Sequence, residues 1–86
     1  MKKNICIYGK KNNIKNPRIG ICVSKKYINK SFNRNKFKRI VRESFRIKKN
    51  NLPNMDFIIK INSKLKNIKN KHIFKILEIL WNQYYF

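Results

Sequence analysis

Alternating apolar and polar positions predict three short strands along the chain. In the segment 4–9, Ile5 and Ile7 lie on one side while Cys6 and Tyr8 lie on the other, which is the period-two pattern of a half-buried strand. The other two expected strands are 18–24, with Ile19, Ile21 and Val23 on its apolar face, and 55–61, with Met55, Phe57, Ile59 and Ile61 on its apolar face. Because only a short polar loop separates the first two strands, we expect them to pair as a hairpin.

Helical spacing of apolar residues predicts two helices. The first begins at Ser31, a plausible N-cap, and reaches about Lys49, after which Asn50 and Pro53 break it. The second closes the chain over residues 72–84. Its apolar face consists of Ile73, Ile76, Leu77, Leu80 and Tyr84. The order of elements is strand, strand, helix, strand, helix, with no internal repeat, so one domain is expected.

The first helix has two faces of opposite character. On a wheel of about 100° per residue, an apolar stripe falls within about 80° of Phe37 and is expected to pack on the sheet. Its members are Phe37, Ile40, Val41, Ser44 and Phe45. A second set, which we call the cationic ridge, falls between about 100° and 200° on the same wheel. It consists of Asn35, Lys38, Arg39, Arg42, Arg46 and Lys49, with Arg34 at its border.

Charge indicates a partner for the cationic ridge. The chain carries 23 Lys and Arg against 3 Asp and Glu, a net charge of +20, and nucleic acid would relieve this self-repulsion. Four of the five arginines lie in this helix, and arginine grips phosphate bidentately. The simpler interpretation is a solvated helix face, although like charges at this spacing destabilise a helix without a partner. Glu43 is placed to pair with Arg39 and Arg46, so we expect it to orient arginines.

Composition excludes several other classes of protein. An apolar fraction of 42% is too high for a disordered basic tail. No apolar run approaches the roughly 18 residues that span a membrane, and the first residues lack the apolar centre of a signal peptide, so a cytoplasmic protein is expected. Cys6, Cys22 and His72 provide too few ligands for a zinc site. A protein nuclease with two metal ions needs clustered carboxylates, whereas the three acidic residues lie on separate elements.

Three segments of the chain carry a family resemblance. They read PRIGICVSKK, RNKFKRIVRESFR and LPNMDFIIKI, in that order. From the second strand onward the chain resembles the bacterial ribonuclease P protein family, whose hallmark is a helix reading RN(R/K)xKRxxRExFR just after a strand ending in V(S/A)KK. The matching residues are Val23, Ser24, Lys25, Lys26, Arg34, Asn35, Lys36, Lys38, Arg39, Arg42, Glu43, Phe45 and Arg46. Lysine replaces the usual arginine at position 36, which keeps the charge but loses the planar fork.

The resemblance implies a fold and a role. The fold is α+β: one small α/β sandwich of the ribonuclease P protein type over residues 1–86, in the order β-β-α-β-α, with a left-handed strand-helix-strand crossover against the usual rule. The role is that of an accessory subunit of an endoribonuclease that removes the 5′ leader of precursor tRNA. The RNA subunit and its Mg²⁺ ions are expected to catalyse the cleavage, and the protein to bind no cofactor alone. Its expected partners are that catalytic RNA, in a 1:1 ribonucleoprotein with a monomeric protein, and precursor tRNA.

The resemblance also implies site residues. Those expected to bind the catalytic RNA are Lys25, Lys26, Arg34, Asn35, Lys36, Lys38, Arg39, Arg42 and Arg46. A cleft on the sheet is expected to hold the leader, and the candidates there are Tyr8, Cys22 and Lys60. The domain is expected to be N-terminally shortened, because the family usually has a further helix that forms one wall of this cleft. Loss of that helix and a start codon set too late are both open.

Two alternatives follow from the aromatic residues and the charge. Tyr8 either stacks on a base or is a tyrosine of the core or its rim. The terminal aromatics are expected to pack on the core and not to form a stacking platform for bases. These terminal aromatics are Trp81, Tyr84, Tyr85 and Phe86. The alternative function is that of a structural RNA-binding protein such as a small ribosomal protein, but such a protein has no reason to show the three ordered segments.

Overall fold

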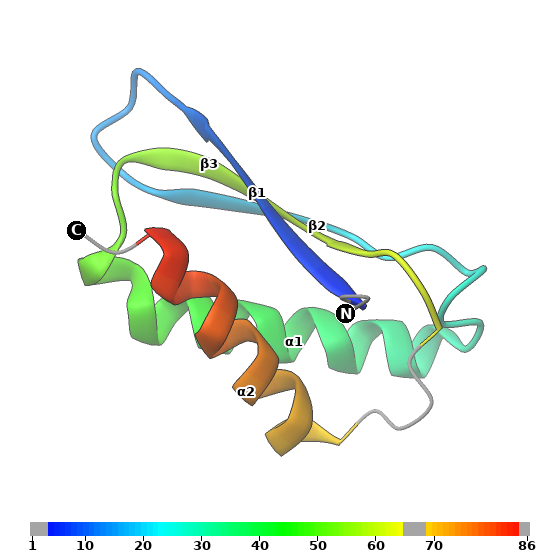
Figure 1. Ribbon diagram of the computed structural model, residues 1–86. Coiled ribbons are helices and arrows are strands. Elements are labelled where there is room, and N and C mark those ends of the chain that lie inside the picture. The colour runs from blue at the N-terminus through cyan, green and yellow to red at the C-terminus, as the bar shows by residue number, and fades with distance from the viewer. Residues whose placement is uncertain (1–3, 65–68, 85–86) are drawn as a thin grey trace.

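The computed structural model describes residues 4–64 and 69–84, which form a three-stranded sheet with two helices on one of its faces (Figure 1). The elements are β1 (Ile5–Lys11), β2 (Arg18–Cys22), α1 (Ser31–Lys48), η1 (Lys49–Asn51), β3 (Met55–Ile61), α2 (Asn70–Trp81) and η2 (Asn82–Tyr84), where η1 and η2 are single 3₁₀ turns. The expected element order and the α+β class are confirmed. The expectations for Tyr85 and Phe86 lie outside the described residues.

The strands are ordered β1-β3-β2, so the expected hairpin of the first two strands is wrong. β3 lies between them, antiparallel to β1 and parallel to β2. A parallel pair needs a long crossover connection, and α1 supplies it between β2 and β3. The central position gives β3, the strand with four apolar residues facing the helices, a hydrogen-bonded neighbour on both edges. The left hand of this crossover stays a prediction.

One layer of apolar side chains between the sheet and the helices forms the core. The fully buried large side chains are Ile5, Phe37, Val41, Phe57, Ile59, Ile61, Ile73, Leu77 and Trp81. The Trp81 ring lies 5.3 Å from Phe57 and 5.8 Å from Phe45, measured between centroids. The Tyr84 hydroxyl donates to the carbonyl oxygen of Ile7 at 2.9 Å. These two terminal aromatics pack on the domain, as expected, and Phe45 packs against the core while staying half-buried.

Helix α1 begins without the expected serine cap. Lys30 occupies the extended N-cap position and makes no side-chain cap hydrogen bond, while Ser31 is already helical. The carbonyl oxygen of Lys30 accepts the backbone N–H of Arg34 at 3.0 Å. The guanidinium of Arg34 also donates to the carbonyl oxygens of Ile28 and Asn29, both at 3.0 Å. This arginine holds the preceding loop against the first turn, so the helix start is fixed without a serine cap.

A buried hydrogen bond joins the two helices. The indole N–H of Trp81 donates to the hydroxyl oxygen of Ser44 at 3.0 Å, and both side chains are almost completely buried. Ser44 is the buried polar residue in the apolar stripe of α1. A buried N–H without an acceptor costs its full desolvation free energy, so this serine matches the tryptophan opposite it.

We predict that Ser44→Ala lowers the free energy of unfolding by about 1–3 kcal/mol, because it leaves the Trp81 N–H buried without an acceptor. Urea denaturation measures the change. In a Trp81→Phe background the same serine substitution should cost clearly less, since no donor remains. Equal costs in the two backgrounds would contradict a role for this hydrogen bond.

Candidate nucleic-acid interface

The cationic ridge occupies the face of α1 that points away from the sheet. The apolar stripe on the opposite side is buried, with Phe37 and Val41 at 0% exposure, so the helix cannot rotate without uncovering the core. Arg39 and Arg42 are exposed and have no hydrogen bond or ion pair with any other described residue. Asn35 is exposed and Lys38 half-buried, while Lys49 falls in the 3₁₀ turn after the helix. Two arginines are therefore available to a partner.

Glu43 binds one of its two expected arginines. The guanidinium of Arg46 donates to both carboxylate oxygens of Glu43, through Nε at 3.2 Å and through Nη2. This hydrogen-bonded cation lowers the pKa of Glu43, and Arg39 takes no part in the contact. Both side chains are exposed, so the pair adds little stability. A phosphate that approaches Arg46 competes with a carboxylate that already orients the guanidinium.

Residues 25–30, which we call the basic connector, lead into α1 and begin with a turn built on Ser24. The carbonyl oxygen of Ser24 accepts the N–H groups of Tyr27 and Ile28 at 3.1 Å, and its hydroxyl oxygen accepts the N–H of Lys26 at 3.1 Å. Ile28 is buried and anchors the turn in the core. Lys25 and Lys26 are consequently exposed on a fixed turn.

Not every residue expected to bind RNA is equally accessible. Arg34 spends two hydrogen bonds on the backbone of this connector, at Ile28 and Asn29, so it positions Lys25 and Lys26 relative to the ridge. Lys36 is half-buried. Sequence reasoning missed this local role of Arg34, because a wheel assigns a face to a residue but not a hydrogen-bond partner.

The sheet face opposite the helices presents three rows of side chains. Strand register aligns them across β1, β3 and β2 as Cys6–Lys60–Cys22, Tyr8–Ile58–Gly20 and Lys10–Asp56–Arg18. Both helices lie on the other face (Figure 1). The Tyr8 side chain is 54% exposed, so it belongs to the open face and not to the core. The structure therefore brings the three leader-cleft candidates, Tyr8, Cys22 and Lys60, onto one surface.

A hollow lies on this open face, where Gly20 leaves a gap in the middle row. Its volume is about 330 Å³, and it is lined by Arg18, Ile19, Gly20, Asp56, Phe57 and Ile58. A Cβ atom added at Gly20 would meet nothing within 4 Å. Sequence reasoning missed the hollow, although a glycine inside a strand is a signal for close approach of a ligand or another backbone.

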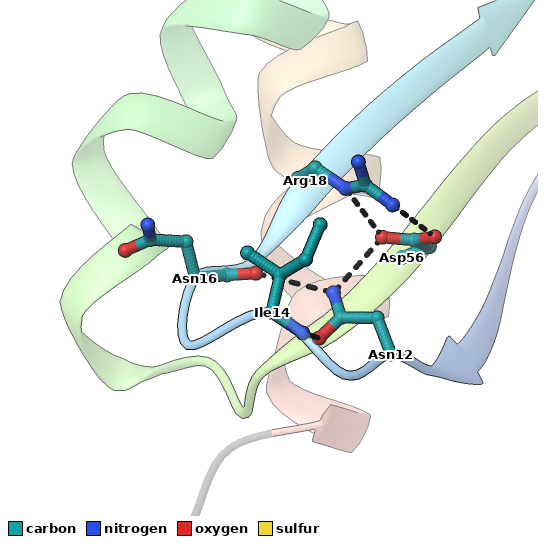
Figure 2. Close-up of polar contacts among 5 residues, drawn as sticks. All are labelled: Asn12, Ile14, Asn16, Arg18 and Asp56. Carbon is teal, nitrogen blue, oxygen red and sulfur yellow. Dashed lines mark hydrogen bonds and ion pairs between the residues drawn. The ribbon is translucent and has the colours of Figure 1, made fainter.

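A polar cluster anchors the loop between β1 and β2 to the start of β3 (Figure 2). The Arg18 guanidinium donates two hydrogen bonds to the Asp56 carboxylate, each at 2.8 Å, and the Asn12 amide donates a third at 2.9 Å. Asn12 also donates to the carbonyl oxygen of Asn16 and accepts the N–H of Ile14. Hydrogen bonding from Arg18, then from Asn12, lowers the pKa of Asp56 to about 2. The carboxylate holds the rim of the hollow in place.

The described residues contain no group of three or more His, Cys, Asp or Glu side chains that could hold a metal ion. Both cysteines are free thiols, and β3 separates them in the sheet, because each is aligned with Lys60. No helix formed by residues 4–64 and 69–84 is long and apolar enough to cross a membrane.

Comparisons with known proteins all point to one family. The family model described as Ribonuclease P matches residues 1–85. The ribonuclease P protein component of Pectobacterium atrosepticum is 38% identical over 80 residues, which cover 93% of this chain and 67% of that protein. The protein component of Baumannia cicadellinicola is 43% identical over 83 residues, covering 96% of this chain and 72% of the relative.

Solved structures are similar over nearly the whole chain. The RNase P protein of Staphylococcus aureus superposes with a TM-score of 0.85 at 29% identity, covering 96% of this chain and 77% of that one. The RNase P protein of Thermotoga maritima gives a TM-score of 0.81 at 28% identity, with 96% and 79% covered. The element arrangement described above is therefore that of these proteins.

We predict that the Asp56 cluster makes the stability of the fold depend on pH in the acid range. A carboxyl whose folded pKa lies below its unfolded value of about 4 stabilises the fold fully above that value, and loses this contribution as the pH falls through about 2. The free energy of unfolding should thus decrease between about pH 4 and pH 2, and Asp56→Asn should flatten part of this decrease. Titration by NMR checks the cause: Asn12→Ala should raise the pKa of Asp56, and a wild-type value near 4 would refute the cluster.

Proposed function

The chain belongs to the ribonuclease P protein family, and we propose that in this enzyme it docks on the catalytic RNA through α1 and holds the 5′ leader of precursor tRNA on the open face of the sheet. Cleavage of the leader is assigned to the RNA subunit and its Mg²⁺ ions. One protein chain serves one RNA, in the cytoplasm. The family findings favour this function over that of a small ribosomal protein.

The observation that carries the proposal is the exposed pair Arg39 and Arg42 on the cationic ridge, within the helix that carries the hallmark of the family. Their guanidinium groups have no partner among the described residues, so no intramolecular contact must break before phosphate binds. Arginine neutralises phosphate and releases condensed counterions, which makes binding tight at low salt and weak at high salt. On this one helix, the ridge cations from Lys38 to Arg46 extend over about 12 Å along the axis.

The arrangement of acidic residues supports a division of labour between protein and RNA. Each of the three acids is paired with a cation: Glu43 with Arg46, Asp56 with Arg18, and Glu78 with Lys48 at 3.9 Å. They lie on α1, β3 and α2, too dispersed to hold two Mg²⁺ ions around one phosphate. The protein therefore contributes position and charge neutralisation, and the activation of water is assigned to RNA-bound metal.

The open sheet face is the proposed leader site. Tyr8 offers an exposed ring for stacking on an unpaired base, Lys60 offers a cation in the next row, and Cys22 lies beside Lys60 on β2. The hollow at Gly20 gives a base room to approach the sheet backbone. The leader is single-stranded, so its bases are free for these contacts, whereas those of the mature tRNA stem are paired.

We predict that the chain restores leader cleavage by its cognate catalytic RNA at a Mg²⁺ concentration too low for the RNA alone. Arg42→Ala should weaken the binding of the chain to this RNA. The variant should also flatten the plot of log affinity against log salt by about one counterion, because one phosphate contact is lost. Filter binding over a salt series measures both effects.

The charge-matched control for Arg42→Ala is Lys75→Ala, which removes one exposed cation from α2 and not from the ridge. It should leave the salt slope unchanged. Equal slopes for wild type and Arg42→Ala would refute the ridge as the RNA dock. Failure of the wild-type chain to stimulate cleavage would refute the proposed function itself.

We predict that Tyr8→Ala and Gly20→Leu both reduce the affinity of the reconstituted enzyme for precursor tRNA by about five- to a hundredfold, the first by removing a stacking ring and the second by filling the hollow. Affinity for mature tRNA, which lacks the leader, should not change. Tyr8→Phe is the control, since it keeps the ring. An equal loss of affinity for precursor tRNA and mature tRNA would show that the open face does not hold the leader.

A further inference from the structure

Phe32 is the most exposed large apolar side chain among the described residues, with 71% of its surface accessible. It lies in the first turn of α1 and is not part of the core or of the apolar side chains packed against it. Its ring has no aromatic or cationic partner among residues 4–64 and 69–84. No contact within the described fold accounts for a phenylalanine at this position.

The position of Phe32 on the helix connects it with the arginines. At about 100° per residue it lies about 20° from Arg39 and about 40° from Arg46, so the ring and the guanidinium groups share one side of α1. Arg39 is seven residues away, which is about 10 Å along the helix axis. An RNA whose phosphates bind Arg39 thus passes within reach of the Phe32 ring.

We propose that Phe32 stacks on an unpaired base of the RNA that binds the cationic ridge. This inference rests on the proposed function. It names a contact of a different kind, because the ring stacks on the face of an exposed base while the arginines bind phosphates. A side chain cannot stack on a base that is inside a continuous duplex, so the ridge docks where a double helix of the RNA meets an unpaired nucleotide.

Charge argues for RNA over the other occupants of an exposed aromatic side chain. A second copy of the chain would bring a net charge of +20 against the same face, which like-charge repulsion opposes. On this side of α1, the cations one and two helical turns from Phe32 are Lys36 and Arg39, which attract a polyanion. When these cations bind phosphates, a neighbouring base is held close to the Phe32 ring, so stacking needs little additional ordering of the RNA.

The first test is affinity for the cognate catalytic RNA transcript over a salt series. Phe32→Ala should weaken binding by about five- to a hundredfold without changing the salt slope, because stacking releases no counterions. Phe32→Tyr should bind the RNA as wild type does, because it keeps a ring. Phe32→Leu should bind nearly as weakly as Phe32→Ala, although leucine is apolar. The thermal unfolding midpoint of the alanine variant should match wild type, since the side chain is exposed.

The second test reports stacking directly. In Phe32→Trp the new exposed indole should lose fluorescence when the RNA binds, while the buried Trp81 of the wild-type chain should not. The matched control is Ile79→Trp, at a side chain 58% exposed on α2, which should not be quenched. Unquenched Phe32→Trp emission in the complex, or a salt-dependent self-association that Phe32→Ala abolishes, would overturn the proposal.

The outcomes separate this inference from the proposed function. If Arg42→Ala weakens RNA binding and Phe32→Ala binds within twofold of wild type, the ridge docks RNA without a stacked base and the inference fails alone. If the wild-type chain binds no catalytic RNA, the proposed function fails, and the stacking inference fails with it.

Discussion

Packing of α1 on the sheet through Phe37, Ile40 and Val41 determines the direction of every other side chain of that helix. These three residues are buried, so rotation of the helix would replace apolar contacts by charged ones at a cost of several kcal/mol. The arginines then have only the outer side available. The availability of α1 for the proposed RNA docking is in this sense a consequence of the core: the same contacts that fold the domain direct Arg39 and Arg42 toward solvent.

Placement of both helices on one face has a second consequence, because it leaves the opposite face of the sheet open. The central strand β3 carries a residue of each row on that face, Asp56, Ile58 and Lys60. Asp56 ties the loop after β1 to the start of β2, although these two strands are not neighbours in the sheet. The domain thus has two separate surfaces, the outer side of α1 and an open sheet face with a hollow, which suit the proposed RNA docking and leader binding.

Sequence patterns predicted faces well and partners poorly. Alternation placed Ile5, Phe57 and Ile59 in the core, and the helical wheel separated the ridge from the packing stripe, because both rest on the geometry of a single element. The predicted hairpin was wrong because the alternation of apolar and polar residues within a strand does not depend on which strand pairs with it. The serine cap was wrong, and the role of Arg34 was missed, because each depends on which backbone groups lie near a side chain in space. The hollow at Gly20 could be suspected from a glycine within a strand, but its walls come from β3.

Charge links the stability of the free protein to the binding of RNA. The three acids are each engaged with one cation, and the Arg18–Asp56 and Arg46–Glu43 pairs are exposed, so they offset little of the repulsion among 23 basic residues. The small apolar core must therefore hold the chain against its own charge, and its stability margin is thin. A ligand that binds only the folded state stabilises it in proportion to RT ln(1 + [L]/Kd). We therefore expect salt to act in opposite directions on the free protein and on the proposed complex. In the free protein it screens repulsion and stabilises the fold, whereas in the complex it would weaken the proposed phosphate contacts.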